Sequence, residues 1–252
     1  MHRAEIGLLI IGSEILLGKR QDRHFARSRD QLAERGYDVA YCLIVPDRWE
    51  LLLSQLRWAF TTGIPFFSFG GLGATPDDLT RACAAAALER PLHRHPEAEA
   101  IIRRRFGAEA EPVRIRMADL PEGAALIPNP INEIPGFAIA GGYFYPGFPQ
   151  MAEPMSQWVL ERYFPAQTAL VEGRALLDAV RESDLVLWME DFCRAHPALE
   201  FSSLPSFRDG HSRIELSIRG PAAELESAWP ALLQALQARG LKLDILLEPQ
   251  QP

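Results

Sequence analysis

The sequence predicts an α/β protein: a three-layer α/β/α domain with a mostly parallel sheet over residues 1–165, followed by a small α+β domain over residues 168–252. In the first part, apolar runs alternate with segments of helical periodicity, which is typical of a parallel sheet covered on both faces. The second part follows the order strand, helix, strand, strand, helix, strand. Residues 164–167 follow a helix and lack periodicity, and they mark the predicted boundary.

Three strands of the first domain are predicted from their apolar patterns. Residues 6–11 are continuously apolar, as expected for a strand buried on both sides. Residues 37–45 carry apolar side chains at alternate positions, and residues 64–69 form a third apolar run. Further along, two short apolar runs flank Gly141 and Gly142, a pair typical of a two-residue hairpin turn.

Helices are predicted between these strands from caps and periodicity. Asp22 is a candidate N-cap for a helix that runs to about Arg35. Asp47 and Glu50 form a capping-box pattern ahead of an apolar stripe that ends near Gly63. Three more helices are expected, over about residues 75–88, 97–106 and 150–163.

The second domain is predicted to have the ferredoxin-like βαββαβ fold, because its elements follow that order. The expected strands cover residues 168–171, 201–207, 213–219 and 241–247, and the expected helices cover residues 174–195 and 222–239.

The composition excludes several classes of protein. A net charge of −7 argues against broad nucleic-acid binding, and no apolar run approaches the ~20 residues that a membrane-spanning helix needs. The three cysteines are too scattered for a disulfide framework or a CxxC metal pair, and no signal-peptide pattern precedes the first predicted strand. We therefore expect a cytoplasmic protein without nucleic-acid or membrane partners.

The strongest local pattern is GGLGATPDDLT at residues 70–80, between a predicted buried strand and a predicted helix. Open α/β sheets bind ligands at this carboxyl edge. Gly70, Gly71 and Gly73 allow the backbone to approach an anion, and a helix that starts at Thr75 would favour negative charge at its N-terminus. The loop is therefore predicted to bind phosphate or pyrophosphate.

A helix start without any ligand is the alternative interpretation of this loop. Thr75 as N-cap, Pro76 in the first turn and Asp78 three residues after Thr75 would make a well-formed start. Capping alone does not require three glycines within four positions, which favours a ligand. Because Asp77 and Asp78 would repel a pyrophosphate, we expect a divalent cation such as Mg²⁺ between them, held by Asp78 with Asp77.

Ser13 and Glu14, in the sequence GSEILLG at residues 12–18, follow the first strand at the same predicted edge. They offer a hydroxyl and a carboxylate to the same crevice. A strand-ending turn with a solvated glutamate explains this segment equally well.

Two proline-rich loops, residues 127–137 and 145–149, form the third candidate. Asn129 could pair with a ring or amide edge, and Pro146 and Gly147 could line the ligand. Loops of this kind also serve as simple connections.

Taken in order, these segments resemble the molybdenum-cofactor biosynthesis domain of the MogA/MoaB/MoeA type, and above all its version at the N-terminus of CinA, the competence/damage-inducible protein. Residues 12–18 resemble that family's GTELLLG, and residues 70–80 resemble its GGLGPTxDDxT. Residues 129–137 resemble its PNPxGxAPGF, and residues 146–149 its LPGVPxEM loop. The resemblance covers about residues 5–163, and nicotinamide-nucleotide deamidation, the activity of CinA's separate amidase domain, is not expected.

The resemblance implies a domain that binds molybdopterin or a nucleotide pyrophosphate with Mg²⁺, Mn²⁺ or Co²⁺. Asp78 matches the family's metal-associated aspartate, and Asp47 corresponds to a second acidic position. One implied function is a metal-dependent pyrophosphohydrolase that acts on a nucleoside diphosphate-sugar such as ADP-ribose, with Asp78, Asp77 and Glu14 in catalytic roles. The alternatives are molybdopterin adenylyl transfer and a non-catalytic binding or assembly module. A homodimer or homotrimer is also implied.

Positions that depart from the family's pattern keep these alternatives open. Asn132, Glu133 and Ile134 stand where Gly, Thr or Ser, and Ala are usual, and Met151 stands where a glutamate is usual. The loss of one carboxylate and the gain of another at Glu133 bear on catalysis more than on the binding loop.

Overall fold

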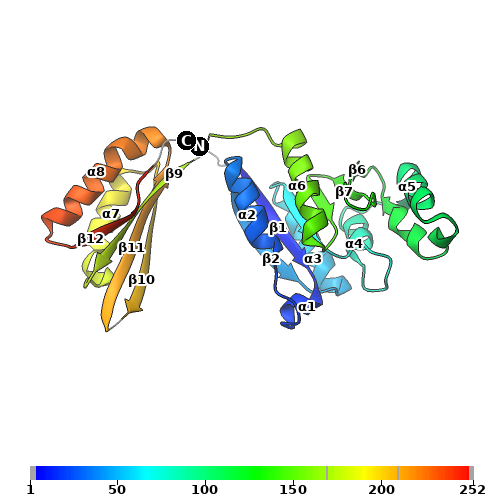
Figure 1. The fold of residues 1–252 in the computed structure, drawn as a ribbon, viewed down its shortest axis with the longest axis horizontal. Coiled ribbons are helices and arrows are strands. Elements are labelled where there is room, and N and C mark those ends of the chain that lie inside the picture. Colours follow the sequence, from blue (N-terminus) through cyan, green and yellow to red (C-terminus); the bar gives the residue numbers. More distant parts are fainter. Residues whose placement is uncertain (1–3, 169, 209, 250–252) are drawn as a thin grey trace. The chain divides into compact units, whose positions relative to one another are not determined.

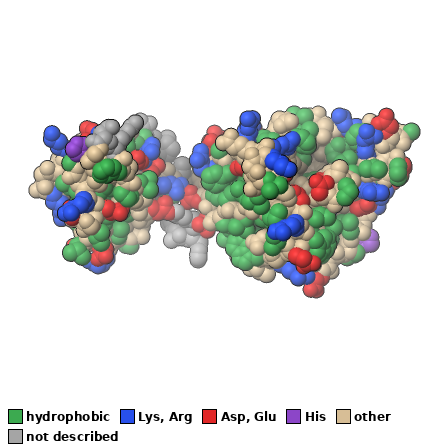
Figure 2. Space-filling model, turned by 90° about the horizontal axis from the view of Figure 1, so that it is seen from below, with side chains coloured by type: hydrophobic (Ala, Val, Ile, Leu, Met, Phe, Trp, Pro, Cys, Tyr) green, Lys and Arg blue, Asp and Glu red, His purple; other side chains and the backbone are tan. Residues whose placement is uncertain are grey.

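The computed structural model describes residues 4–168, 170–208 and 210–249. The chain folds into two compact units, Met1–Gln167 and Thr168–Pro252 (Figure 1). In the face shown in Figure 2, basic and acidic side chains are mixed over both units. Within the described residues, no helix is both long and apolar enough to cross a membrane.

A six-stranded sheet forms the centre of the first unit. Its strands lie in the order β2 (Asp38–Val45), β1 (Glu5–Ile11), β3 (Phe66–Phe69), β8 (Gly142–Tyr145), β7 (Gly136–Ile139) and β6 (Ala125–Ile127). The first four are mutually parallel, and β7 runs antiparallel to both of its neighbours. The predicted mostly parallel sheet is confirmed.

Helices cover both faces of this sheet, which makes the predicted three layers. Helices α2 (His24–Glu34) and α6 (Pro149–Tyr163) pack on one face, and α3 (Trp49–Thr61) and α4 (Thr80–Ala87) on the other. A hydrophobic core lies on each face of the sheet, and alternate residues of β1 belong to one core or the other. Leu8 and Ile10 face α2 and α6, whereas Leu9 faces α3 and α4. This explains why the strand reads as a continuous apolar run.

A smaller lobe extends this unit beyond α4. It contains β4 (Leu92–Arg94), which pairs with β5 (Asp119–Pro121), helix α5 (Pro96–Phe106) and two short 3-10 helices, Gly107–Ala110 and Arg114–Ala118. The α5 prediction is confirmed to within one residue. The β4–β5 pair was not predicted, because both strands have only three residues, which is too short to show an apolar alternation.

The starts of three helices test the predicted caps. Asp22 accepts hydrogen bonds from the amides of His24 and Phe25, so its predicted capping role is confirmed. The predicted capping box of α3 is wrong: no side chain caps this helix, and Asp47 bonds to Ser13 instead. The helix predicted from Thr75 begins only at Thr80, because Asp78 folds back onto the preceding loop.

The β7–β8 hairpin is confirmed with its turn one residue earlier than predicted. Ala140 and Gly141 occupy the turn, both with positive φ (49° and 82°). Two such residues are what a tight primed turn requires.

The second unit has the predicted βαββαβ order. Its strands β9 (Val171–Asp178), β10 (Glu200–Arg208), β11 (His211–Gly220) and β12 (Leu243–Leu247) form an antiparallel sheet in the order β10-β11-β9-β12. Helices α7 (Val186–Ala195) and α8 (Ala222–Ala238) contribute to the unit's core. A 3-10 turn, Glu182–Asp184, precedes α7.

The boundaries predicted at the start of this unit were wrong. Residues 174–178 belong to β9 rather than to a helix, and α7 is about half the predicted length. Strict alternation of buried and half-buried positions runs along the whole of β9. That period of two is the strand signal, and it was obscured because the small residues Gly173 and Ala175 occupy two of the buried positions.

Candidate ligand-binding site

A cavity of about 480 Å³ lies at the carboxyl ends of β1, β2, β3 and β8. Parallel strands end at one edge, so the loops that follow them meet there. The cavity brings together most of the predicted site residues: Glu14, Asp47, Gly70, Gly71, Gly73, Thr75, Asp77, Asp78, Asn129, Pro146 and Gly147. Ser13 does not line the cavity, but it is hydrogen-bonded to Asp47, which does.

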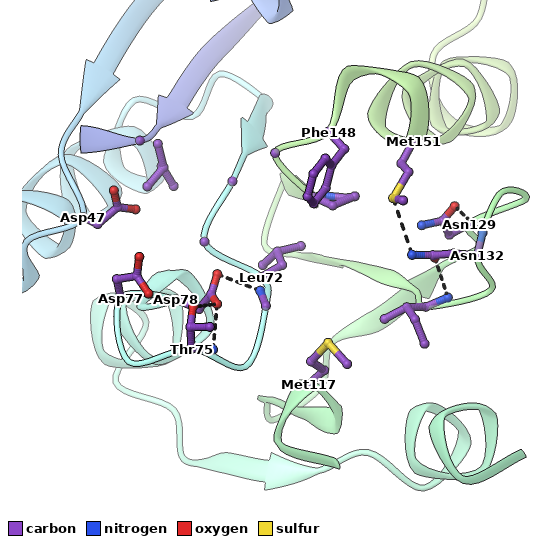
Figure 3. Close-up of a pocket in the computed structure, with 18 of the residues that line it drawn as sticks. Asp47, Leu72, Thr75, Asp77, Asp78, Met117, Asn129, Asn132, Phe148 and Met151 are labelled. Carbon is purple, nitrogen blue, oxygen red and sulfur yellow. Dashed lines mark hydrogen bonds between the residues drawn. The ribbon is translucent and has the colours of Figure 1, made fainter. Parts of the chain in front are cut away.

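The cavity has two chemically different sides (Figure 3). Asp47, Asp77 and Asp78 lie on one side. Phe148, Met151 and the amides of Asn129 and Asn132 lie on the other, with Met117 at a further edge. An acidic side that faces an apolar and amide side suits a ligand with a charged group at one end and a ring at the other.

Asp78 organises the glycine-rich loop. Its Oδ1 accepts the amide of Gly73 at 2.8 Å, and its Oδ2 accepts the amide of Thr75 at 2.9 Å as well as the Thr75 hydroxyl. In this conformation the amides of Gly73 and Thr75 are therefore not available to a ligand anion. A carboxylate of the loop itself occupies them.

Three other amides of this loop can still donate to an anion. Among the residues that the structure describes, the N–H groups of Gly71, Leu72 and Ala74 donate to no protein acceptor. Gly71 and Leu72 both line the cavity. An incoming anion therefore has free donors on this loop, although fewer than the sequence suggested.

Close packing inside the protein requires at least two of the loop's glycines. A Cβ on Gly70, whose φ is 106°, would lie 2.3 Å from the carbonyl oxygen of Ile11. A Cβ on Gly73 would lie 2.4 Å from Asp78 Oδ2. The argument that three glycines imply a ligand was therefore incomplete, because the loop's own packing accounts for at least two of them.

Arg81 holds the loop from below, and sequence reasoning missed it. Its side chain is buried, and its guanidinium donates to the carbonyl of Leu72 and, at 2.7 Å, to that of Gly73. Burial lowers the pKa of Arg81, and the nearby carboxylate of Asp78 opposes that shift. Both carbonyls are thereby directed inward, towards Arg81.

Ser13 and Asp47 join the ends of β1 and β2. The Ser13 amide donates to Asp47 Oδ2 at 2.7 Å, and the Asp47 amide donates to Ser13 Oγ at 2.9 Å. Glu14 lies beside them and forms a 3.9 Å ion pair with Arg20. Ser13 is thus a positioning residue for Asp47, while Glu14 and Asp47 face the cavity.

Asn129 presents a buried donor without a protein partner. Its side chain is 4% exposed, and its Oδ1 accepts the amides of Ile131 and Asn132. These two bonds fix the orientation of the amide, because the flipped form would set donor against donor. Within the described part of the chain, Nδ2 has no hydrogen-bond partner.

Comparison with known proteins assigns the first unit to a protein family. Residues 7–166 match the family described as "Probable molybdopterin binding domain". The chain belongs to this family. A protein from Aeropyrum pernix is 30% identical over 242 residues, which cover 91% of this chain and 90% of that protein.

Two further comparisons show that this member of the family is similar to CinA. A CinA-like protein from Citrifermentans bemidjiense is 36% identical over 175 residues, which cover 67% of this chain but only 42% of that protein. The crystal structure of "the protein CinA with unknown function from Thermoplasma acidophilum" is 28% identical, with a TM-score of 0.58, over 63% of this chain and 97% of that one. The predicted resemblance is confirmed.

Positions that depart from the family pattern have structural roles in this member. Glu133 lies outside the cavity, at φ 66°, and pairs with Arg104 at 2.9 Å; this bond lowers the pKa of Glu133. The pair ties the loop after Asn129 to α5. Asn132 donates to Met151 Sδ at 3.5 Å, so these two residues close one wall of the cavity.

The carboxylates of this family member suit a cation that is shared with a ligand. Within the described residues, no group of three or more His, Cys, Asp or Glu side chains could hold a metal ion by itself. Mg²⁺ commonly binds one or two carboxylates together with substrate phosphates. Asp47 and Asp77 fit that role better than Asp78, whose two oxygens already accept three hydrogen bonds.

Other cavity residues were not predicted as site residues. Phe106 and Met117 come from the smaller lobe, and Phe148 lies in the proline-rich loop between β8 and α6 that the sequence did single out. Arg20 lies two residues beyond the GSEILLG segment, and no pattern in the sequence pointed to it.

Proposed function

We propose that this chain binds a nucleotide or pterin ligand through a pyrophosphate and that it hydrolyses a nucleoside diphosphate-sugar such as ADP-ribose. The observation that carries the proposal is a cavity in which carboxylates face an apolar side with an amide donor that has no partner among the described residues. With a divalent cation between it and the carboxylates, the pyrophosphate of such a ligand would lie on one side, and its ring would lie on the other.

The chain's own residues supply binding and orientation. The free amides of Gly71 and Leu72 would hold phosphate oxygens, and the Asn129 Nδ2 would donate to an acceptor on the ring. Asp47 and Asp77 would hold the divalent cation, which when bound polarises the phosphoryl oxygens. Glu14 would take the proton of the attacking water as it adds to phosphorus.

The experiment is AMP release from ADP-ribose with Mg²⁺, Mn²⁺ or Co²⁺. Addition of one water across the pyrophosphate bond yields AMP and ribose 5-phosphate. We expect Asp47→Asn and Asp77→Asn each to lower kcat/KM by at least about tenfold, as the loss of a metal-binding or charge-stabilising group does. Asp30→Asn, which removes an exposed carboxylate of α2 outside the cavity, is the matched control.

Two results would redirect the proposal. A folded wild-type protein that releases no AMP with any of these ions is not this hydrolase, and tight ADP-ribose binding would then indicate a binding module. ATP consumption only when molybdopterin is present would indicate adenylyl transfer instead. The cytoplasmic location and the homo-oligomeric state stay predictions, for cell fractionation and light scattering to test.

A further inference from the structure

A second hollow, of about 420 Å³, adjoins the ligand cavity. It lies between the segment that leads into α2 and the start of α6, and three arginines line it: Arg20, Arg23 and Arg27. The two spaces share four lining residues, Glu14, Arg20, Gly147 and Phe148. A ligand in the cavity could therefore extend into the hollow without leaving the protein surface.

The charges of this hollow are only partly compensated. Arg27 pairs with Glu153, and Arg20 lies 3.9 Å from Glu14. Asp22 also lines the hollow, but both of its oxygens accept backbone amides at the start of α2. Within the described part of the chain, Arg23 has no carboxylate partner. The lining itself thus holds three arginines and two carboxylates, Glu14 and Asp22.

Its floor is rigid and uncharged. His24 is 7% exposed, stacks on Phe69 with ring centroids 4.6 Å apart, and has its Nε2 3.4 Å from the carbonyl oxygen of Gly147. Burial lowers the pKa of His24, which leaves the ring neutral at neutral pH. Helix α6 begins at the same place, and no side chain caps its N-terminus. An anion here would meet both the helix dipole and the arginines.

We propose that this hollow is a subsite for a phosphomonoester carried by the same ligand, beyond the pyrophosphate held in the main cavity. The preferred substrate class is then a phosphorylated nucleoside diphosphate-sugar. The inference rests on the proposed function for the placement of the pyrophosphate. Guanidinium groups bind phosphate through paired N–H donors, and the carboxylates of the main cavity repel an anion that no cation screens.

The test compares binding of ADP-ribose with binding of ADP-ribose 2′-phosphate by calorimetry, in the presence of Mg²⁺. We expect the wild-type chain to bind the phosphorylated ligand about tenfold more tightly, the scale of one charged hydrogen bond at a partly exposed site. Arg23→Gln should remove most of that preference. Arg29→Gln makes the same charge change one turn and a half along α2, at a residue that pairs with Asp30 outside the hollow, and should retain it.

Failure of the inference and failure of the proposed function give different results. Equal affinities for the two ligands, or a preference that survives Arg23→Gln, overturn the subsite while leaving the hydrolase proposal intact. If neither ligand binds, the proposed function fails, and inorganic phosphate becomes the probe. Phosphate-induced NMR shifts at residues 23–27 that disappear in Arg23→Gln but not in Arg29→Gln would still support the subsite. Shifts that are absent or unchanged in both variants would overturn it.

Discussion

Replacement of Asp78 by asparagine tests whether this carboxylate organises the loop or acts on a ligand. In the structure, its two oxygens accept the amides of Gly73 and Thr75 and the Thr75 hydroxyl. Asparagine keeps one of the two acceptors. Whichever way its amide turns, one backbone N–H then faces an NH₂ group, so the variant loses at least one bond and gains a donor–donor contact.

The expected loss follows from these bonds. A hydrogen bond to a charged acceptor contributes about 1.5–3 kcal/mol, and partial exposure of Asp78 places this one at the lower end. The open form of the loop should therefore become about tenfold more populated, since ~1.4 kcal/mol corresponds to a factor of ten. The fold of the sheet should not change, because β3 ends before the loop.

Amide hydrogen exchange at Gly73 and Thr75 measures this opening directly. We expect both amides to exchange about tenfold faster in Asp78→Asn than in the wild-type chain. Asp77→Asn makes the same charge change one residue earlier without touching either amide, so exchange there should stay at the wild-type rate. Equal exchange rates in the two variants would refute the loop-organising role. If the role holds, lost activity in Asp78→Asn alone is no evidence for catalysis.

Three further predictions concern single side chains. Tyr145→Phe should raise the free energy of unfolding by about 1 kcal/mol in urea titrations, because the buried hydroxyl has no hydrogen-bond partner within the described residues; a destabilised variant would contradict this. Burial lowers the pKa of His24 below its ordinary 6.5. As the pH drops below 6.5, the imidazole therefore becomes protonated more readily in the unfolded chain than in the folded one, and the free energy of unfolding should fall. His24→Phe should flatten that part of the profile, and an unchanged slope would count against it. Glu133→Gln should leave ADP-ribose hydrolysis unchanged, since Glu133 pairs with Arg104 outside the cavity; a large loss of kcat would return Glu133 to the site.

The sequence was sufficient for the fold where the physical signal is local. The continuous apolar run of β1 and the alternation in β2 predicted a buried sheet, and Asp22 predicted the start of α2 correctly. It failed where a contact distant in sequence decides. Helix α3 begins at Trp49, close to the predicted place, but Asp47 bonds to Ser13, 34 residues away, instead of capping the helix, and no local pattern distinguishes these two roles.

The candidate site divides in the same way. The acidic and glycine-rich side comes from short motifs that follow strands, and topology alone brings them to one edge. The smaller lobe adds Phe106 and Met117 to the cavity lining. Met117 lies in a short 3-10 turn, which has no periodicity to predict it, and Phe106 ends a helix that was predicted but whose position relative to the sheet edge no local pattern gives.

The glycine-rich loop shows why a motif that indicates anion binding needs its contacts examined. Its glycines fit the backbone of β1 and the side chain of Asp78, and Asp78 takes two of the amides that an anion would use. What remains is a loop whose amides at Gly71 and Leu72 have no acceptor among the described residues and lie beside the carboxylate of Asp78. A phosphate at these donors would meet the charge of Asp78 unless a cation intervened. The loop is therefore suited to a metal-bound phosphate rather than to a free one, and phosphate binding at Gly71 and Leu72 should strengthen when Mg²⁺ is added.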